Sequence, residues 1–378
     1  MNAVNWQDER RLYPAASAQT YLLTAAVGPI SSPVMSSYQN HYQSLLQSGD
    51  IDWMENVEML GHVRELTAQF INAHGAHEVA FGPNTSMAMN FLAMGFSSLL
   101  KSHGKKQKIL SCREEFPSST IPWLHHKYEV TQVPAKDLIQ EAERGDYSMV
   151  VCSAVQFGTG YRQNLRKLGE VCRSRNVYFV VNATQALGAY PIDVQACGIS
   201  AMTASCHKWM CCGYGLCVMY LSQELLKEFS SPIAGWLSMN DPLAMNNRQL
   251  DLKCEASVLE VGIPSFAIVG ALGEHLKQLN RIGIENIAER ILELSRYASE
   301  ELSRYHEVAS ERTSSPSLNT CDSGILLLST DKAGMLEEKL ASRRIHVSVR
   351  QGGLRIATHF FNDHKDIDNL TDVLKEIH

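Results

Sequence analysis

Residues 178–221 read YFVVNATQALGAYPIDVQACGISAMTASCHKWMCCGYGLCVMYL. Three short apolar runs lie within this stretch, at 178–181, 201–204 and 216–220. Continuous apolar runs of this length are typical of strands in a parallel sheet that helices cover on both faces. Polar residues follow the first two runs directly, beginning at Asn182 and at Ser205. Because such sheets bind ligands beyond the carboxyl ends of their strands, we expect the functional site at these residues.

Further apolar runs precede this stretch and alternate with segments of helical periodicity. They lie at 79–81, 109–112 and 149–152. This alternation predicts an α/β fold with a mainly parallel sheet between helices.

The pattern changes near residue 251. Apolar residues at helical spacing predict a helix over 284–302 and another near 332–342, and a last helix is expected from about 364. Short strands are expected between these helices, at 325–328, 345–349 and 354–357. The sequence therefore predicts an N-terminal arm (1–19), a large domain (20–250) and a small α+β C-terminal domain (251–378).

The composition is that of a folded enzyme-sized protein. The chain has 378 residues, of which 45% are hydrophobic and 20% charged, with a formal net charge of −6. A mildly acidic chain without a basic run is a poor nucleic-acid binder, so no nucleic-acid partner is expected. No apolar stretch reaches the ~20 residues of a membrane span, so no membrane partner is expected. Most of the ten cysteines lie in apolar runs, which favours reduced thiols and a cytoplasmic location.

Lys208 is the first candidate for a catalytic residue. It follows a predicted strand and precedes the apolar sequence Trp-Met-Cys-Cys. A desolvated lysine has a lowered pKa, which suits a nucleophile that forms a Schiff base. The alternative interpretation is a lysine whose ammonium reaches solvent from the strand end. This segment alone leaves both interpretations open.

The cysteines near Lys208 raise the question of a zinc site. Cys206 with Cys211, and Cys212 with Cys217, have a spacing that structural zinc sites use. The two pairs abut without a loop to fold them around one ion, and Cys217 lies in a predicted strand. We therefore expect no metal site.

The order of motifs resembles the class V aminotransferase family, which includes cysteine desulfurases, kynureninases, isopenicillin N epimerase-like proteins and C–S lyases. The family pattern is a strand ending in Asp-x-x-Gln and then Ser-x-His-Lys. Here the first motif reads Asn182-Ala183-Thr184-Gln185, and the second reads Ser205-Cys206-His207-Lys208. The resemblance implies a fold type I enzyme that uses pyridoxal 5′-phosphate, with a seven-stranded sheet in its large domain. It also implies a homodimer with the active site at the subunit interface.

The resemblance assigns the cofactor contacts residue by residue. It implies that Lys208 binds the cofactor covalently, that Gln185 bonds its phenolic oxygen, and that Asn182 faces its ring nitrogen. Phosphate contacts are implied for Ser205 and His207. The other implied cofactor contacts are Thr85 and Ser86 at the phosphate, Phe116 stacked on the ring, and Gln156 beneath it. For Thr85 and Ser86, ordinary capping of the following helix is the alternative.

The substrate contacts come from the two ends of the chain. Residues 354–362 (LRIATHFFN) resemble the family segment whose arginine binds a substrate α-carboxylate, which assigns this role to Arg355. Arg350 is a weaker candidate for the same role. Residues 21–26 resemble the N-terminal strand on the substrate side of the site, which places Thr24 and Ala25 there. The expected substrate is a small α-amino acid or a conjugate that contains one.

Three departures from the family pattern bear on the reaction. Asn182 replaces an aspartate that keeps the ring nitrogen protonated. Ile263 stands where the family often has a threonine that reaches the partner subunit's phosphate. Residues 346–353 contain no cysteine, so the persulfide mechanism of desulfurases is not expected. We expect β-elimination, with transamination or epimerisation as the alternative; a binding or regulatory protein that has lost catalysis is the alternative from another class.

Overall fold

The computed structural model describes residues 4–51, 53–303 and 322–376. Within these residues, seven strands form the central sheet in the order β2-β8-β7-β6-β5-β3-β4. The strands are β2 (Val79–Gly82), β3 (Lys108–Cys112), β4 (Glu129–Val133), β5 (Met149–Ser153), β6 (Tyr178–Asn182), β7 (Ala201–Ser205) and β8 (Cys217–Leu221). Strand β8 is antiparallel to both of its neighbours, and the other pairings are parallel. The predicted mainly parallel, seven-stranded sheet is therefore confirmed.

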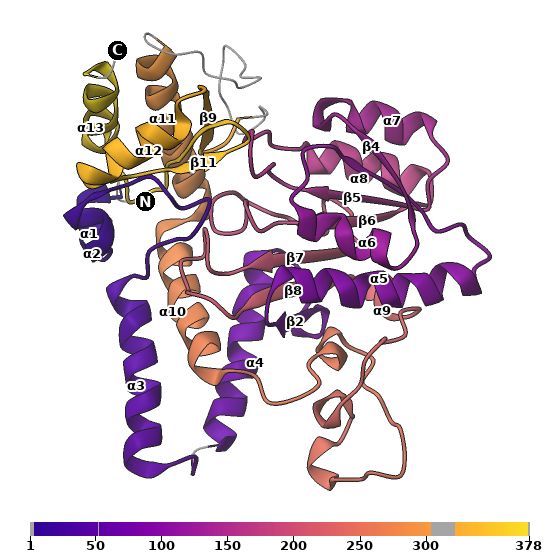
Figure 1. Cartoon of the computed structure of the whole chain (residues 1–378). Coiled ribbons are helices and arrows are strands. Elements are labelled where there is room, and N and C mark those ends of the chain that lie inside the picture. The colour runs from indigo at the N-terminus through magenta and orange to yellow at the C-terminus, as the bar shows by residue number, and fades with distance from the viewer. Residues whose placement is uncertain (1–3, 52, 304–321, 377–378) are drawn as a thin grey trace.

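Helices cover both faces of the central sheet (Figure 1). Alternate residues along the strands belong to the hydrophobic cores on opposite faces. On β5, Met149 and Val151 share a core with helix α5 (Thr85–Ser102) and with Trp123 of α6 (Ile121–His125). Val150 and Cys152 point to the other face and share a core with α7 (Leu138–Arg144) and α8 (Leu165–Ser174). Burial on both faces explains why these strands are continuously apolar.

Strand β4 is the exception among the seven strands, because no apolar run predicted it. It lies at the edge of the sheet and pairs only with β3 among the described strands. Its five residues are exposed or only half-buried. An edge strand of this kind needs no continuous apolar run.

A second, smaller sheet lies in the C-terminal part of the chain. In the described residues it has three antiparallel strands in the order β11-β12-β9. The elements here are α11 (Ile284–Ser303), β9 (Ile325–Ser329), α12 (Ala333–Ser342), β10 (Ile345–His346), β11 (Ser348–Arg350), β12 (Gly353–Ala357) and α13 (His364–Lys375). The strand predicted over 345–349 is thus divided in two, because β10 pairs with β1 (Thr20–Tyr21) and β11 with β12.

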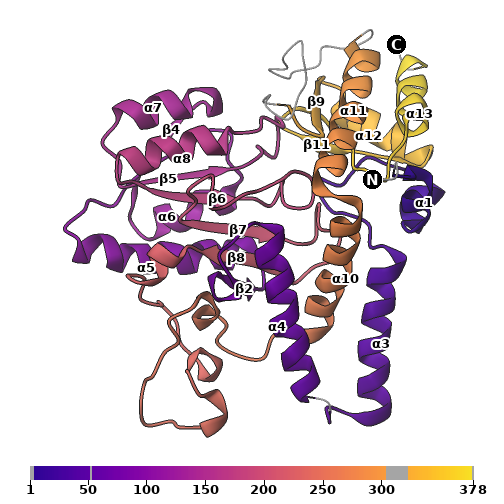
Figure 2. The same cartoon turned by 180° about the vertical axis from the view of Figure 1, so that it is seen from behind.

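Three long helices pack together beside the large sheet (Figure 2). They are α3 (Ser32–Ser48), α4 (Trp53–Phe70) and α10 (Phe266–Ile282). The short helix α9 (Gln223–Leu226) follows β8.

The domain boundaries at residues 19 and 250 stay predictions. No helix among the described residues is long and apolar enough to cross a membrane.

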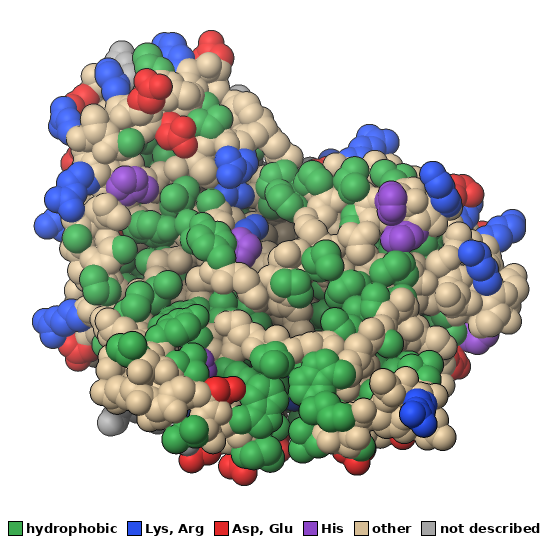
Figure 3. Space-filling model, turned by 60° about the horizontal axis from the view of Figure 1, so that its bottom comes forward, with side chains coloured by type: hydrophobic (Ala, Val, Ile, Leu, Met, Phe, Trp, Pro, Cys, Tyr) green, Lys and Arg blue, Asp and Glu red, His purple; other side chains and the backbone are tan. Residues whose placement is uncertain are grey.

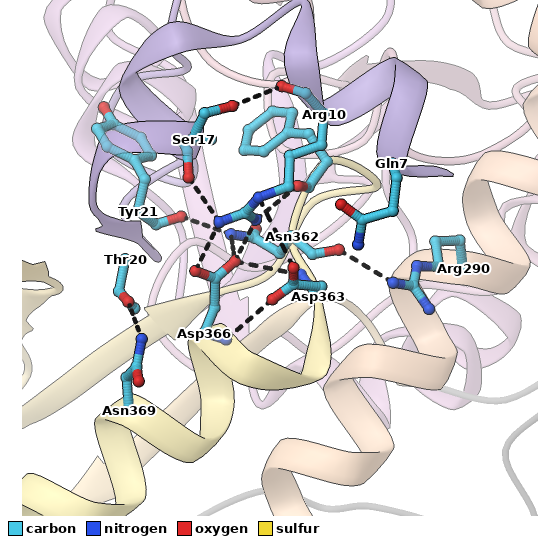
Figure 4. Close-up of polar contacts among 12 residues, drawn as sticks. Gln7, Arg10, Ser17, Thr20, Tyr21, Arg290, Asn362, Asp363, Asp366 and Asn369 are labelled. Carbon is cyan, nitrogen blue, oxygen red and sulfur yellow. Dashed lines mark hydrogen bonds and ion pairs between the residues drawn. The ribbon is translucent and has the colours of Figure 1, made fainter. Parts of the chain in front are cut away.

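The N-terminal segment is held against the C-terminal helix (Figure 4). It forms α1 (Trp6–Arg11) and α2 (Pro14–Ala18). The Arg10 guanidinium donates to both carboxylate oxygens of Asp366, at 2.6 and 3.0 Å, and to the backbone carbonyls of Phe361 and Ala16. These contacts connect the first residues of the chain to α13, near the segment that carries Arg355.

Candidate active site

A cavity of about 280 Å³ lies at the carboxyl ends of the central parallel strands. Ser153, Asn182 and Ser205, the last residues of β5, β6 and β7, line it. The predicted site residues that line the cavity are Ala25, Thr85, Ser86, Phe116, Asn182, Gln185, Ser205, His207, Lys208 and Arg355. The structure thus brings together residues that are up to 330 positions apart in the chain (25 to 355).

Lys208 has the environment of a reactive amine. It follows β7, and its Nζ lies 5.5 Å from the centroid of the Phe116 ring. Burial, reinforced by the positive charges of Arg355 and Arg350, lowers the pKa of Lys208 to about 7. A large share of this amine is therefore neutral and nucleophilic at neutral pH. This environment favours the nucleophile over a solvent-reaching ammonium.

One end of the cavity is built from hydroxyl groups at the start of α5. The Thr85 hydroxyl lies 2.8 Å from the Ser205 hydroxyl and 3.0 Å from the Thr184 hydroxyl. The Ser86 hydroxyl lies 2.7 Å from that of Ser118. The cap of this helix is Asn84, whose side chain accepts from a backbone N–H of the first turn. Because Asn84 caps α5, both hydroxyls stay at the cavity, where an anion can bind at the helix N-terminus.

His207 lines the same cavity as a neutral side chain. Burial and the adjacent Lys208 lower its pKa to about 4. Its ring stacks on Tyr214, with the centroids 5.3 Å apart. At neutral pH His207 can therefore donate or accept one hydrogen bond, but it carries no charge.

Two buried amides are held in fixed orientations. Asn182 donates from Nδ2 to the Ser119 hydroxyl at 2.9 Å and accepts at Oδ1 from the Thr184 N–H at 3.1 Å. Gln185 donates from Nε2 to the Ala25 carbonyl at 2.9 Å and accepts at Oε1 from the Trp209 indole at 2.7 Å. Each amide nitrogen retains a second hydrogen, so both side chains can still donate to a bound group.

Arg355 is a buried cation in the middle of β12. It is 2% exposed, and it donates from Nε to the Ser348 hydroxyl at 3.2 Å and from Nη1 to the Phe157 carbonyl at 2.8 Å. Burial and the charge of Arg350 lower its pKa to about 10, so it remains charged at neutral pH. No carboxylate of the described residues forms an ion pair with it. A buried guanidinium without an acidic partner is well suited to bind a substrate carboxylate.

Two predicted site residues do not line the cavity. Gln156 is buried and donates from Nε2 to Glu115 at 2.9 Å. Thr24 is buried, and its hydroxyl has no hydrogen-bond partner among the described residues. In the described part of the chain, no group of three or more His, Cys, Asp or Glu side chains is placed to hold a metal ion.

Several residues in and beside the cavity were not predicted from the sequence. Those that line the cavity are Ala26, Asn84, Ser118, Ser153, Phe157 and Thr184. Glu115 does not line the cavity but is buried beside Ser153, which does. Nothing in the local sequence distinguishes Glu115 from its neighbour Glu114. The polar residues that directly follow strand β3 were the one sequence signal that could have indicated a functional residue at this position.

Comparisons with known proteins identify the family of this chain. The family model described as "Aminotransferase class-V" matches residues 20–370. The uncharacterized aminotransferase YcbU of Bacillus subtilis is 24% identical, over 98% of each chain. The isopenicillin N epimerase of Amycolatopsis lactamdurans is also 24% identical, over the whole of each chain.

The architecture agrees as well. The apo structure of a cysteine desulfurase from Thermococcus onnurineus NA1 superposes with a TM-score of 0.87 at 19% identity, covering 100% of this chain and 99% of that one. This likeness confirms the predicted fold type I architecture. Since the family model matches nearly the whole length, the chain belongs to the class V aminotransferase family.

Proposed function

We propose that this enzyme catalyses β-elimination from a small α-amino acid or a conjugate that contains one. Its cofactor is pyridoxal 5′-phosphate, which supplies an electron sink for bond cleavage at the substrate Cα. The observation that carries the proposal is the pairing of two groups in one cavity. Lys208 offers a buried amine with a pKa of about 7, and Arg355 offers a buried guanidinium with no acidic partner among the described residues.

The residues present fit this cofactor. Lys208 would hold it covalently, and the hydroxyls of Thr85, Ser86 and Ser205 with the neutral His207 would hold its phosphate. Gln185 would donate to the phenolic oxygen from its second Nε2 hydrogen. The remaining proposed contacts are Phe116 against the ring and Asn182 at the ring nitrogen. Gln156, which does not line the cavity, would act from behind these residues through its hydrogen bond to Glu115.

The substrate contacts follow from the same cavity. Arg355 would bind the α-carboxylate through its planar fork, and Ala25, with Thr24 beside it, would border the substrate. Once the amino group of a substrate had replaced Lys208 on the cofactor, the freed Lys208 amine could take the proton from the substrate Cα. A pKa of about 7 suits this role, because a general base works best when its pKa is near the operating pH.

Asn182 favours elimination over transamination. A neutral amide cannot supply the negative charge of the usual aspartate, so charge that develops at Cα is less stabilised. Transamination depends most on this stabilisation, whereas loss of a good leaving group from Cβ relieves the charge quickly. Transamination and epimerisation are the runners-up, and the relatives named as an aminotransferase and an epimerase favour them. Asn182 and Ile263 would also suit a binding protein that has lost catalysis.

We also propose that the protein is a cytoplasmic homodimer with the site near the subunit interface. Hydrophobic side chains gather on the face shown in Figure 3. Several large apolar side chains on and between α3 and α4 are at least half exposed: Tyr42, Leu46, Ile51 and Met54. A second copy of the chain would cover such side chains. Tyr214, which stacks on His207, is 74% exposed and would lie close to such an interface.

An amino-acid panel tests the proposed reaction. The holoprotein is incubated with amino acids that have or lack a leaving group at Cβ, and keto acid, ammonia and enantiomer ratio are measured. We expect equal amounts of keto acid and ammonia, only from substrates with a leaving group. Keto acid that requires an added amino acceptor would instead indicate an aminotransferase, and a changed enantiomer ratio an epimerase. Spectral changes without any product would indicate a binding protein.

A further inference from the structure

Glu115 is a buried acid that the proposed reaction does not yet use. It lies between β3 and Phe116, and it is 8% exposed. Its carboxylate accepts from the Ser153 N–H at 2.6 Å, from the Ser153 hydroxyl and from Gln156 Nε2 at 2.9 Å. The Ser119 hydroxyl lies close enough to this carboxylate to lower its pKa. No lysine, arginine or histidine in the described part of the chain forms an ion pair with it.

The Ser119 hydroxyl connects Glu115 to Asn182. A serine hydroxyl has one hydrogen, and the Glu115 carboxylate is the anionic acceptor near it. The Ser119 oxygen can then only accept, and it accepts from Asn182 Nδ2 at 2.9 Å. At its other end, Asn182 accepts from the Thr184 N–H. The hydrogen bonds therefore run in one direction, from Asn182 through Ser119 to Glu115.

We propose that Glu115 is a positioning residue that controls the proton on the ring nitrogen of the bound cofactor, acting through Ser119 on Asn182. This inference rests on the proposed function, in which Asn182 faces that nitrogen. In a buried network each hydrogen bond polarises the next, so donation from Asn182 Nδ2 toward an anionic group makes Asn182 Oδ1 a stronger acceptor. The second lone pair of Oδ1 could then accept from a protonated ring nitrogen. Glu115 would thereby restore part of the charge that Asn182 lacks.

The other charged and titratable groups around Glu115 do not replace it. Cys112 and Cys152 are buried near it, and burial raises the pKa of both thiols, so they are neutral. Lys208 and Arg355 line the cavity and would disfavour a protonated ring. Burial raises the pKa of Glu115 itself, while its four donors oppose that shift. The carboxyl group and the ring nitrogen would therefore titrate as a coupled pair.

The test is ¹⁵N NMR of holoprotein reconstituted with pyridoxal phosphate labelled at the ring nitrogen. In Glu115→Gln the ratio of protonated to neutral ring nitrogen should fall about tenfold at a given pH, on the order of one pKa unit. Ser119→Ala breaks the same connection and should move the signal in the same direction. Glu114→Gln is the matched control, because that carboxylate accepts from the Ala135 N–H outside this network, and its signal should stay at the wild-type position.

A wild-type signal in Glu115→Gln that still binds the cofactor would overturn the inference. If that variant fails to fold, Ser119→Ala decides by the same criterion. A wild-type protein that binds no labelled cofactor would contradict the proposed function instead, so the two failures are distinguishable.

Discussion

Replacing Lys208 with alanine is expected to abolish covalent attachment of pyridoxal phosphate and to lower turnover by on the order of 10³-fold. The methyl group can neither bond the cofactor aldehyde nor take a proton from the substrate Cα. The purified wild-type protein should be yellow, and the variant should lose that visible absorbance. Turnover is measured with the best substrate of the panel, in the presence of excess cofactor.

The matched control for this experiment is Lys167→Ala. Lys167 lies on α8, its side chain is 53% exposed, and it does not line the cavity. This variant should retain both colour and turnover. A Lys208→Ala protein that kept its visible absorbance and its turnover would show that Lys208 is not the reactive amine.

Arg355→Lys is expected to weaken the binding of carboxylate-bearing substrates by ~1.5–3 kcal/mol. That loss corresponds to a rise of about 10- to 150-fold in the substrate KM. Lysine keeps the charge but loses the planar fork, two of whose nitrogens bond Ser348 and Phe157 and so fix its direction. The measurement is KM together with cofactor content, which should be unchanged.

Arg350→Lys serves as the comparison for Arg355→Lys. Arg350 lines the same cavity but is exposed, and it donates to its own strand's backbone at Val349. Its substitution should raise KM less than that of Arg355. A parallel loss of cofactor and substrate binding in Arg355→Lys would mean that this residue has a structural role.

The sequence predicted the strands of the central sheet that are largely buried. The runs that became β5, β7 and β8 are almost entirely apolar because helices cover both faces of the sheet. Edge strand β4 gave no such signal, since solvent reaches it. The division of residues 345–349 between two sheets was also not predictable, because the partners of β10 and β11 are distant in the sequence.

The site residues also could be predicted from the sequence only in part. Lys208 was a candidate because it follows a predicted strand and precedes an apolar segment, and the family resemblance added Ser205 and His207 beside it. Arg355 was predicted as a site residue only from the family resemblance, because no local sequence pattern connects it to Lys208. The role proposed for Glu115 was not predictable, because it depends on a hydrogen bond between Ser119 and Asn182, which are 63 positions apart in the chain.

The most direct test of the proposed site is to identify which lysine binds the cofactor. The holoprotein is reduced with borohydride and digested, and the peptides are analysed by mass spectrometry. The pyridoxyl group is expected on Lys208 and on no other lysine. A pyridoxyl group on a different lysine, or none on protein that has bound the cofactor, would contradict the assignment of this cavity as the active site.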